Sequence, residues 1–228
     1  MSRLRRIVRP VALAAVLPLL FGTDAMAVPV VPGAGPTVQP GTSLAANPAL
    51  AGSVLADVDT TWWSPVDPQY GFPGAQGELE ARIVRETGSG TLDFYWRITV
   101  DAISYPNDVP LLLTISGLSL SRFPGGAAFD GDYRTDDGDD VAPIDAYAAA
   151  QSVTWDFAPG SLGPGTSSHF LFLRSEAGAF DATATASIGA ILAITFAPSP
   201  VPEPAPAAIV AAGLALLAAR WRAARDRA

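Results

Sequence analysis

Residues 92–102 read LDFYWRITVDA, and an apolar side chain recurs there at every second position from Leu92 to Ala102. Because successive side chains of an extended strand point to opposite faces, one face of this segment is apolar and the other is polar. The polar face carries Asp93, Tyr95, Arg97, Thr99 and Asp101. This pattern predicts a half-buried strand of an antiparallel sheet.

Strands are predicted on both sides of this segment, with almost no helix. Leu79, Ala81 and Ile83 alternate with charged residues, and the turn at residues 87–90 joins that strand to residues 92–102 as a hairpin. Further short apolar stretches predict strands at residues 54–58, 111–120, 153–157, 170–174, 182–188 and 191–196. Only residues 144–150 suggest a turn of helix. We expect one all-β domain over residues 53–198, an antiparallel β-sandwich of jelly-roll-like type.

The composition excludes several kinds of site. The chain has no Cys, which rules out disulfides, zinc–thiolate sites and a thiol nucleophile. It has no Lys either, so every permanently basic side chain is an Arg. Residues 28–200 hold 6 Arg and 19 acidic residues, a net charge of −13 with His neutral. Such an acidic domain repels phosphates, so we expect no nucleic-acid partner.

The N-terminal residues 1–27 have the pattern of a secretory signal peptide. The basic start MSRLRR is followed by the apolar run VALAAVLPLLFG and by Ala25-Met26-Ala27, a small-x-small cleavage signature. We expect export through the Sec machinery and cleavage after Ala27. The alternative is an N-terminal membrane anchor. Residues 28–52, rich in Pro, Gly and Ala and without periodicity, are expected to form a flexible leader.

The C-terminal residues 199–228 combine a proline motif, an apolar run and a basic end. The motif is Val201-Pro202-Glu203-Pro204, and the apolar run covers residues 205–219. As a helix, that run would rise about 22 Å, which is short of a hydrocarbon core of about 30 Å. The basic end at residues 220–228 contains Arg220, Arg222, Arg225 and Arg227. These arginines favour the cytoplasmic side, so a single transmembrane helix would leave the middle domain outside the inner membrane.

This order of parts resembles the PEP-CTERM sorting tail of Gram-negative bacteria. The resemblance implies recognition by an exosortase, a membrane-embedded cysteine transpeptidase-like enzyme, with Pro202, Glu203 and Pro204 as the recognised residues. It also implies transient anchoring in the inner membrane and a final place in the cell envelope or the extracellular matrix, where exopolysaccharide is a further expected partner. Short phrases of the body, such as GTLDFYW at residues 90–96, are similar to those of other such proteins. The alternative is an ordinary tail anchor.

An acidic stretch offers the best candidate for an ion site. Clustered carboxylates in a Gly-rich loop suit calcium, which takes roughly six to eight oxygen ligands. The candidate ligands are Asp130, Asp132, Asp136, Asp137, Asp139 and Asp140. The spacing does not match an EF-hand loop. The alternative is a solvated acidic loop between strands.

Other candidate residues point more weakly to chemistry. His169 is the sole histidine, and Ser168 beside it would point to the opposite face of a strand. Glu78 and Glu80 share one strand face with Arg82, which favours a charged outer face over a glycosidase pair. Four aromatic residues suit either stacking on sugars or closure of one end of the sandwich, namely Trp62, Trp63, Tyr70 and Phe72.

The function expected from these patterns is structural or interactive. No constellation for nucleophilic or acid–base catalysis emerges, so we expect a non-enzymatic β-sandwich without a required cofactor. The alternative function is a glycan-binding or calcium-binding module of lectin-like type.

Overall fold

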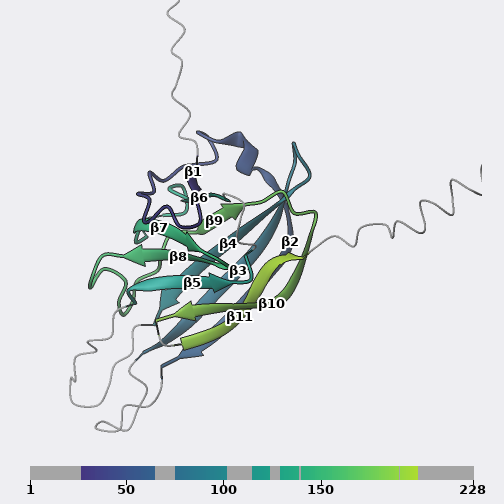
Figure 1. The fold of residues 1–228 in the computed structure, drawn as a ribbon. Helices are drawn as coiled ribbons and strands as arrows, with labels where there is room; N and C mark the ends of the chain where they lie inside the picture. Colours follow the sequence, from purple (N-terminus) through teal and green to yellow (C-terminus); the bar gives the residue numbers. More distant parts are fainter. Residues whose placement is uncertain are drawn as a thin grey trace, which may run out of the picture.

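The fold of the chain is all-β, with two antiparallel sheets. The structure is a computed structural model, and it describes residues 27–64, 75–101, 115–123, 129–138, 140–189 and 191–199. The six-stranded sheet contains, in spatial order, β1 (Val28–Val30), β6 (Phe129–Tyr133), β9 (Leu171–Arg174), β4 (Leu92–Val100), β3 (Gln76–Glu86) and β2 (Gly52–Trp63). The five-stranded sheet contains β11 (Ile191–Ser199), β10 (Ala179–Ile188), β5 (Gly117–Ser121), β8 (Ser152–Phe157) and β7 (Pro143–Ala149). Figure 1 shows the two sheets layered one over the other.

The hairpin predicted from residues 79–102 is confirmed as β3 and β4. These strands pair in antiparallel register, with Ala81 opposite Trp96. Strand β2 pairs with β3 in the same way, so β2, β3 and β4 form a meander within one sheet. The jelly-roll detail of the prediction is therefore wrong, because a jelly roll distributes consecutive strands over two sheets.

The helical turn expected at residues 144–150 is also wrong. This segment forms β7, which pairs with β8 through partners such as Ala146 and Trp155. Ala146 and Ala148 are buried and Ile144 is 47% exposed, which is the alternation of a strand. Alanine favours helix only weakly, and pairing with a neighbouring strand overrides that preference.

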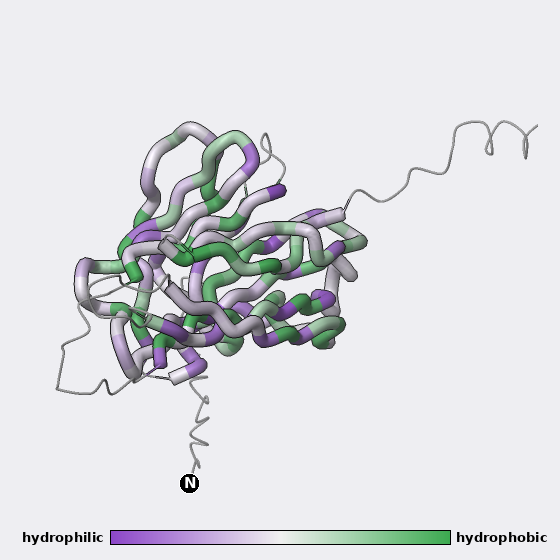
Figure 2. The backbone as a smooth tube through the Cα atoms, turned by 90° about the horizontal axis from the view of Figure 1, so that it is seen from below, coloured by the Kyte–Doolittle hydropathy of each residue, from purple (hydrophilic) through white to green (hydrophobic). Residues whose placement is uncertain are grey.

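The main core lies between the two sheets. Its largest fully buried side chains include Phe94, Trp96, Phe123 and Trp155. The Trp96 indole Nε1 donates a hydrogen bond to Thr195 Oγ1 at 2.7 Å, which ties β4 of one sheet to β11 of the other. In Figure 2 apolar and polar residues alternate along the strands, as a two-layered core requires.

The flexible leader expected at residues 28–52 is instead built into the sandwich. Strand β1 pairs with β6, and Val30 is completely buried in the main core. Farther along, Thr37 exchanges backbone hydrogen bonds with Ala146 at 2.8 and 2.9 Å. A short 3-10 helix, η1 (Pro48–Leu50), buries the side chain of Leu50. Composition predicted disorder here because the segment is rich in Pro, Gly and Ala, and its partners lie from about 35 to more than 100 residues away in the sequence.

A second cluster of buried side chains lies on the outer face of the six-stranded sheet. Its members are Ala27, Leu50, Val84, Tyr95, Phe170 and Phe172. The polar face of β4 is consequently buried over its first half, where Asp93 and Tyr95 are 0% and 3% exposed, while Arg97 and Thr99 farther along remain partly exposed. The expectation of a half-buried strand therefore holds for the second half of β4 and fails for the first, because residues 27–51 add a layer that period-two patterning does not reveal.

Several predicted segments lie outside the described residues. These are the signal peptide up to residue 26, the aromatic residues Tyr70 and Phe72, and the sorting tail from Val201 to Arg227. Within the ranges that the structure does describe, no helix has the length and apolar character needed to span a bilayer.

Candidate functional site

The carboxylates of the acidic stretch do not converge on a single point. Asp130 is exposed on β6, whereas Asp132 on the same strand is buried and accepts a hydrogen bond from Gly41 N at 2.8 Å. Asp136 accepts two hydrogen bonds from the Arg134 guanidinium, each 2.7 Å long. Residues 129–133 form a strand, so the continuous acidic loop of the sequence does not exist. Asp139 lies outside the described residues.

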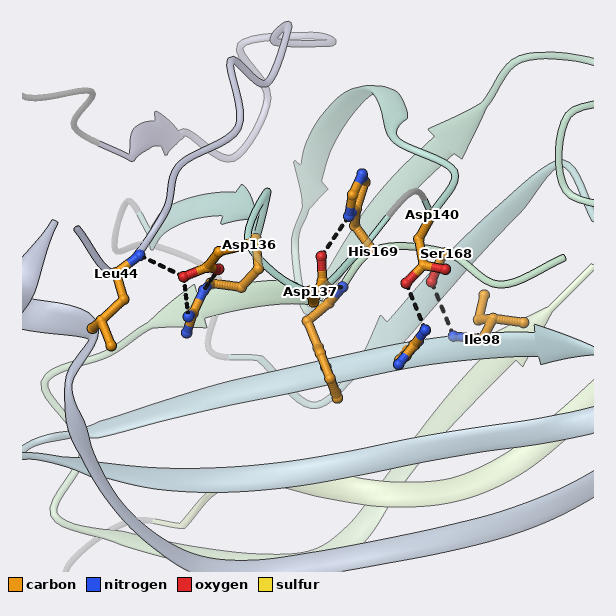
Figure 3. Close-up of polar contacts among 10 residues, drawn as sticks. Leu44, Ile98, Asp136, Asp137, Asp140, Ser168 and His169 are labelled. Atoms are coloured by element: carbon orange, nitrogen blue, oxygen red, sulfur yellow. Dashed lines mark hydrogen bonds and ion pairs between the residues drawn. The ribbon is translucent and has the colours of Figure 1, made fainter. Parts of the chain in front are cut away.

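Two other members of the stretch do meet, and they meet at the sole histidine. Ligand-type atoms of Asp137, Asp140 and His169 all lie within 4.8 Å of one another. Nδ1 of His169 is 2.6 Å from Asp137 Oδ1, while Phe170 N donates to the other Asp137 oxygen at 2.6 Å. The Tyr133 ring stacks on the imidazole with centroids 5.2 Å apart. Figure 3 shows Asp137, Asp140 and His169 gathered beside the strand that carries Ile98.

This cluster is an internally paired network. Asp140 forms an ion pair of 2.6 Å with Arg97 on β4, so each carboxylate already has a protein partner. An imidazole with two carboxylates suits a divalent transition metal better than calcium, which prefers oxygen ligands alone. Any such ion would have to displace the Asp137–His169 contact. Within the described residues, the network holds residues 134–138 and 140–141 against β4 and against the two residues before β9.

His169 does not form a nucleophile–base pair with its neighbour. The Ser168 hydroxyl is fully buried and accepts a hydrogen bond from Ile98 N at 3.0 Å (Figure 3). The prediction that Ser168 and His169 face apart therefore agrees with their contacts. His169 itself is only 9% exposed, and it lies two residues before the start of β9.

A cavity of about 360 Å³ opens next to this network, over the outer face of the six-stranded sheet. One wall comes from residues 44–54, and the floor comes from β3, β4 and Phe170, the residue just before β9. The lining residues that carry polar side chains are Arg82, Tyr95, Arg134 and Asp137. The apolar lining comes from Leu44, Leu50, Val54, Val84 and Phe170.

The two arginines of the cavity are already partly neutralised. Arg82 contacts Asp57 at 3.0 Å and Glu80 at 2.6 Å, and Arg134 is held by Asp136. A guanidinium has five N–H donors, so both side chains keep donors for a ligand. Burial raises the pKa of the Glu80 carboxyl although Arg82 lowers it. The charged outer face expected from Glu78, Glu80 and Arg82 agrees with the Glu80–Arg82 pair.

The floor of the cavity combines an aromatic ring with an unbonded hydroxyl. The Arg82 and Arg97 guanidinium carbons lie 4.8 and 5.6 Å from the centroid of the Phe170 ring. The Tyr95 hydroxyl is buried and makes no hydrogen bond of good geometry. Burial and then the neighbouring Asp93 raise the pKa of Tyr95, while Arg134 and Arg174 lower it. The sequence pattern had placed Arg82 and Tyr95 on outward faces, but nothing in it indicated that Leu44 and Leu50 would cover them.

Of the four aromatic residues suggested for sugar stacking, the structure describes Trp62 and Trp63, and these two differ in exposure. Trp62 is 2% exposed and packs in the main core, which is the closing role that was the alternative. Trp63 is 64% exposed at the end of edge strand β2. Only Trp63 of this pair is accessible to a ligand.

A buried charge cluster was missed by the sequence analysis. Arg174 on β9 contacts Glu86 at 2.9 Å and lies 3.9 Å from Asp93, whose two oxygens are buried without hydrogen bonds. Burial raises the pKa of Asp93 to about 7, although Arg174 lowers it. Glu86 and Asp93 belong to the same hairpin, but Arg174 lies about 80 residues farther along the chain, and only strand register brings it opposite Asp93.

Comparisons with known proteins do not extend these observations. A scan against protein-family models, a search of curated proteins and a search of solved structures each found no match to this chain.

Proposed function

We propose that the chain is an exported protein of the cell envelope or extracellular matrix that is sorted through its C-terminal tail. The observation that carries the proposal is the order of three parts in the sequence: Val201-Pro202-Glu203-Pro204, the apolar run 205–219 and the terminal arginines. In this proposal the Sec machinery exports the chain, the apolar helix holds it briefly in the inner membrane, and an exosortase removes the tail. A cysteine-free β-sandwich is compatible with such a route, because its folding needs no disulfide chemistry.

The intact mass of the protein tests the proposal in cells with and without the processing enzyme. We expect the mass of the tail beyond the proline motif to be lost only in cells that contain the enzyme. Glu203→Ala should block this loss, and Glu176→Ala in the sandwich serves as the matched control. An equal full-length mass in both cell types would indicate an ordinary tail anchor instead.

We propose a non-enzymatic, interactive role for the sandwich, and the cavity favours glycan binding within that role. Its volume lies within the range of small-ligand pockets, about 300–1,000 Å³. Apolar side chains on one wall suit the C–H face of a sugar ring, while Arg82, Arg134 and the Tyr95 hydroxyl suit its oxygens. In the extracellular matrix, the glycan that this cavity would bind is exopolysaccharide.

Titration of the protein with neutral and uronic-acid oligosaccharides tests glycan binding. We expect Tyr95→Phe to weaken binding by about fivefold to tenfold, the effect of one lost hydrogen bond. Tyr147→Phe on β7 removes a hydroxyl from the other sheet and should leave binding unchanged. Equal binding by both variants, or no binding by the wild type, would contradict the proposal. Calcium binding stays a prediction, and a calcium-dependent rise in melting temperature would support it.

A further inference from the structure

The side chain of Asp132 is a buried carboxylate without a charged partner. It is 0% exposed, and its Oδ1 accepts a hydrogen bond from Gly41 N at 2.8 Å while Oδ2 makes no hydrogen bond. Within the described ranges, no arginine forms an ion pair with it. Burial raises the pKa of Asp132 to about 6, against hydrogen bonds from the backbone of Tyr133 and Gly41. Such a group destabilises a fold unless a cation compensates it.

The strand register places one particular peptide bond beside this carboxylate. Val28 lies opposite Gly131 in the β1–β6 pair, so the next residue toward the N-terminus, Ala27, comes level with Asp132. Val30 points into the main core, so Ala27 points to the outer face. Asp132 points the same way, because its partner Phe172 belongs to the outer cluster together with Ala27. Ala27 is only 8% exposed, so the space around it is enclosed.

We propose that cleavage after Ala27 creates the missing cation. The new α-ammonium group of Val28 forms an ion pair with Asp132 and donates a hydrogen bond to the unbonded Oδ2. This inference rests on the signal peptide of the proposed function. In the uncut chain the same nitrogen is a neutral amide with a single N–H, so the pair exists only in the processed protein. A free terminus can also rotate toward the carboxylate, whereas a peptide nitrogen is fixed by its plane.

Through this ion pair, cleavage after Ala27 would stabilise the layer of residues that covers the six-stranded sheet. Asp132 already holds Gly41, and β1 is the first element of the segment that continues to Leu50. The ammonium therefore fastens both ends of residues 28–41 to β6. Since residues 44–54 form one wall of the cavity, removal of the signal peptide would stabilise the wall as well.

The absence of Lys allows a selective experiment. In a chain that begins at Val28, the α-amine is the only primary amine, so an acetylating reagent modifies that group alone. Residues 28–228, kept in mild detergent, are acetylated in urea and refolded, and the folding equilibrium constant is compared with that of the unmodified chain. We expect acetylation to lower it by about tenfold, the effect of one hydrogen bond between charged groups.

Two variants separate the ion pair from a general effect of the modification. In Asp132→Asn, acetylation should lower the folding equilibrium constant by less than about twofold, whereas exposed Asp130→Asn should behave as the wild type. An equal loss in all three proteins, or no loss in the wild type, would overturn the proposal.

A second measurement covers the case in which Asp132→Asn does not fold. The amine of the folded wild type should react with an activated ester at pH 7.5 about tenfold more slowly than the amine of the peptide VPVVPGAGPT. Equal rates would contradict the pair. The N-terminal sequence of the exported protein separately tests cleavage after Ala27, so failure of the export proposal is distinguishable from failure of the pair.

Discussion

The outer faces of the two sheets differ in kind. On the five-stranded sheet, short hydroxyl side chains from β5, β8 and β10 are half-buried and lie in register across the strands, namely Ser119, Ser121, Thr154, Thr185 and Ser187. On the six-stranded sheet, the corresponding face carries Asp93, Tyr95 and Phe172, all almost completely buried. In the sequence, both faces have the pattern of the polar side of an amphipathic strand over part of their length. A strand's polar face is thus a solvent face only when no other segment packs against it.

The hydrogen bonds of the two faces follow this difference. On the five-stranded sheet, Thr154 Oγ1 donates to Ser119 Oγ at 3.0 Å, a neutral contact that remains partly accessible. On the six-stranded sheet the contacts are ionic and enclosed, as in the pair between Arg174 and Glu86. Buried charges are costly unless paired, so the covered face should respond strongly to mutation and to pH, and the hydroxyl face should not.

The largest expected effect is the loss of a ring from the covered face. Phe172→Ala removes a fully buried side chain from the outer cluster and should lower the free energy of unfolding by about 3–5 kcal/mol. The matched change on the other sheet, Ile194→Ala, affects a side chain that is 68% exposed and should cost less than about 1 kcal/mol. Urea unfolding of both variants measures the difference. Similar losses would mean that residues 27–51 do not cover the sheet.

The next effect concerns pH. Because burial raises the pKa of Asp93 to about 7 from 3.8, the folded state binds a proton that the unfolded state has released. The associated stability is complete below about pH 4 and is lost as the pH rises through about 7. Asp93→Asn cannot ionise, so its stability relative to the wild type should increase between pH 4 and pH 8 by on the order of 3 kcal/mol.

Urea unfolding at pH 4, 6 and 8 provides the test. Some pH dependence should remain in Asp93→Asn of the uncut chain, because the pKa of Asp132 is also raised there, to about 6. If the two proteins show parallel curves, the Asp93 carboxyl is solvated and the face is less well covered than described.

A smaller effect distinguishes two glycines of the covering segment, residues 27–51. Gly41 has a φ of 75°, and an added Cβ would lie 2.5 Å from Cζ of Tyr133, a ring held by stacking on His169. Gly33 has a φ of 78° with nothing within 4 Å of such an atom. Both Ala variants strain the backbone, so Gly33→Ala should cost about 1 kcal/mol and Gly41→Ala about 2 kcal/mol more. If thermal unfolding shows the same loss of stability for both variants, the Tyr133 side chain moves to make room for the added Cβ.

The smallest effect is expected at the edge of the hydroxyl face. Leu192 on edge strand β11 is 71% exposed, so Leu192→Lys should change the free energy of unfolding by less than about 0.5 kcal/mol. A charge on an exposed edge opposes strand-to-strand association, so sedimentation at high concentration should show less self-association than in the wild type. A large loss of stability would place Leu192 in a contact that the described structure lacks.

Local patterning accounts for most of the strands that the structure contains. The β3–β4 hairpin and strands β2, β8, β9, β10 and β11 all follow from alternation or from short apolar runs bounded by turns. The exceptions are instructive. Strand β6 was not predicted, because its residues form an acidic stretch without an apolar alternation. Asp130 and Asp132 belong to the strand through backbone pairing with β9, which the character of their side chains does not reveal.

The candidate site was far less predictable. The acidic stretch pointed to Asp137 and Asp140, and the sole His was noted, but their meeting depends on a backbone that returns to the same place after more than 25 residues. The cavity depends on Leu44 and Leu50, which belong to a segment whose composition indicates disorder.

The amino-acid sequence alone determined the fold class, the absence of thiol chemistry and the expectation of processed ends, because each depends on composition or on neighbours a few residues apart. Only the tertiary structure decided which polar face would be buried, which carboxylate oxygens of Asp132 and Asp93 would lack hydrogen bonds, and which residues would enclose a cavity. The physical reason is that burial depends on contacts between distant segments, and a residue's own local pattern carries no information about what packs over it.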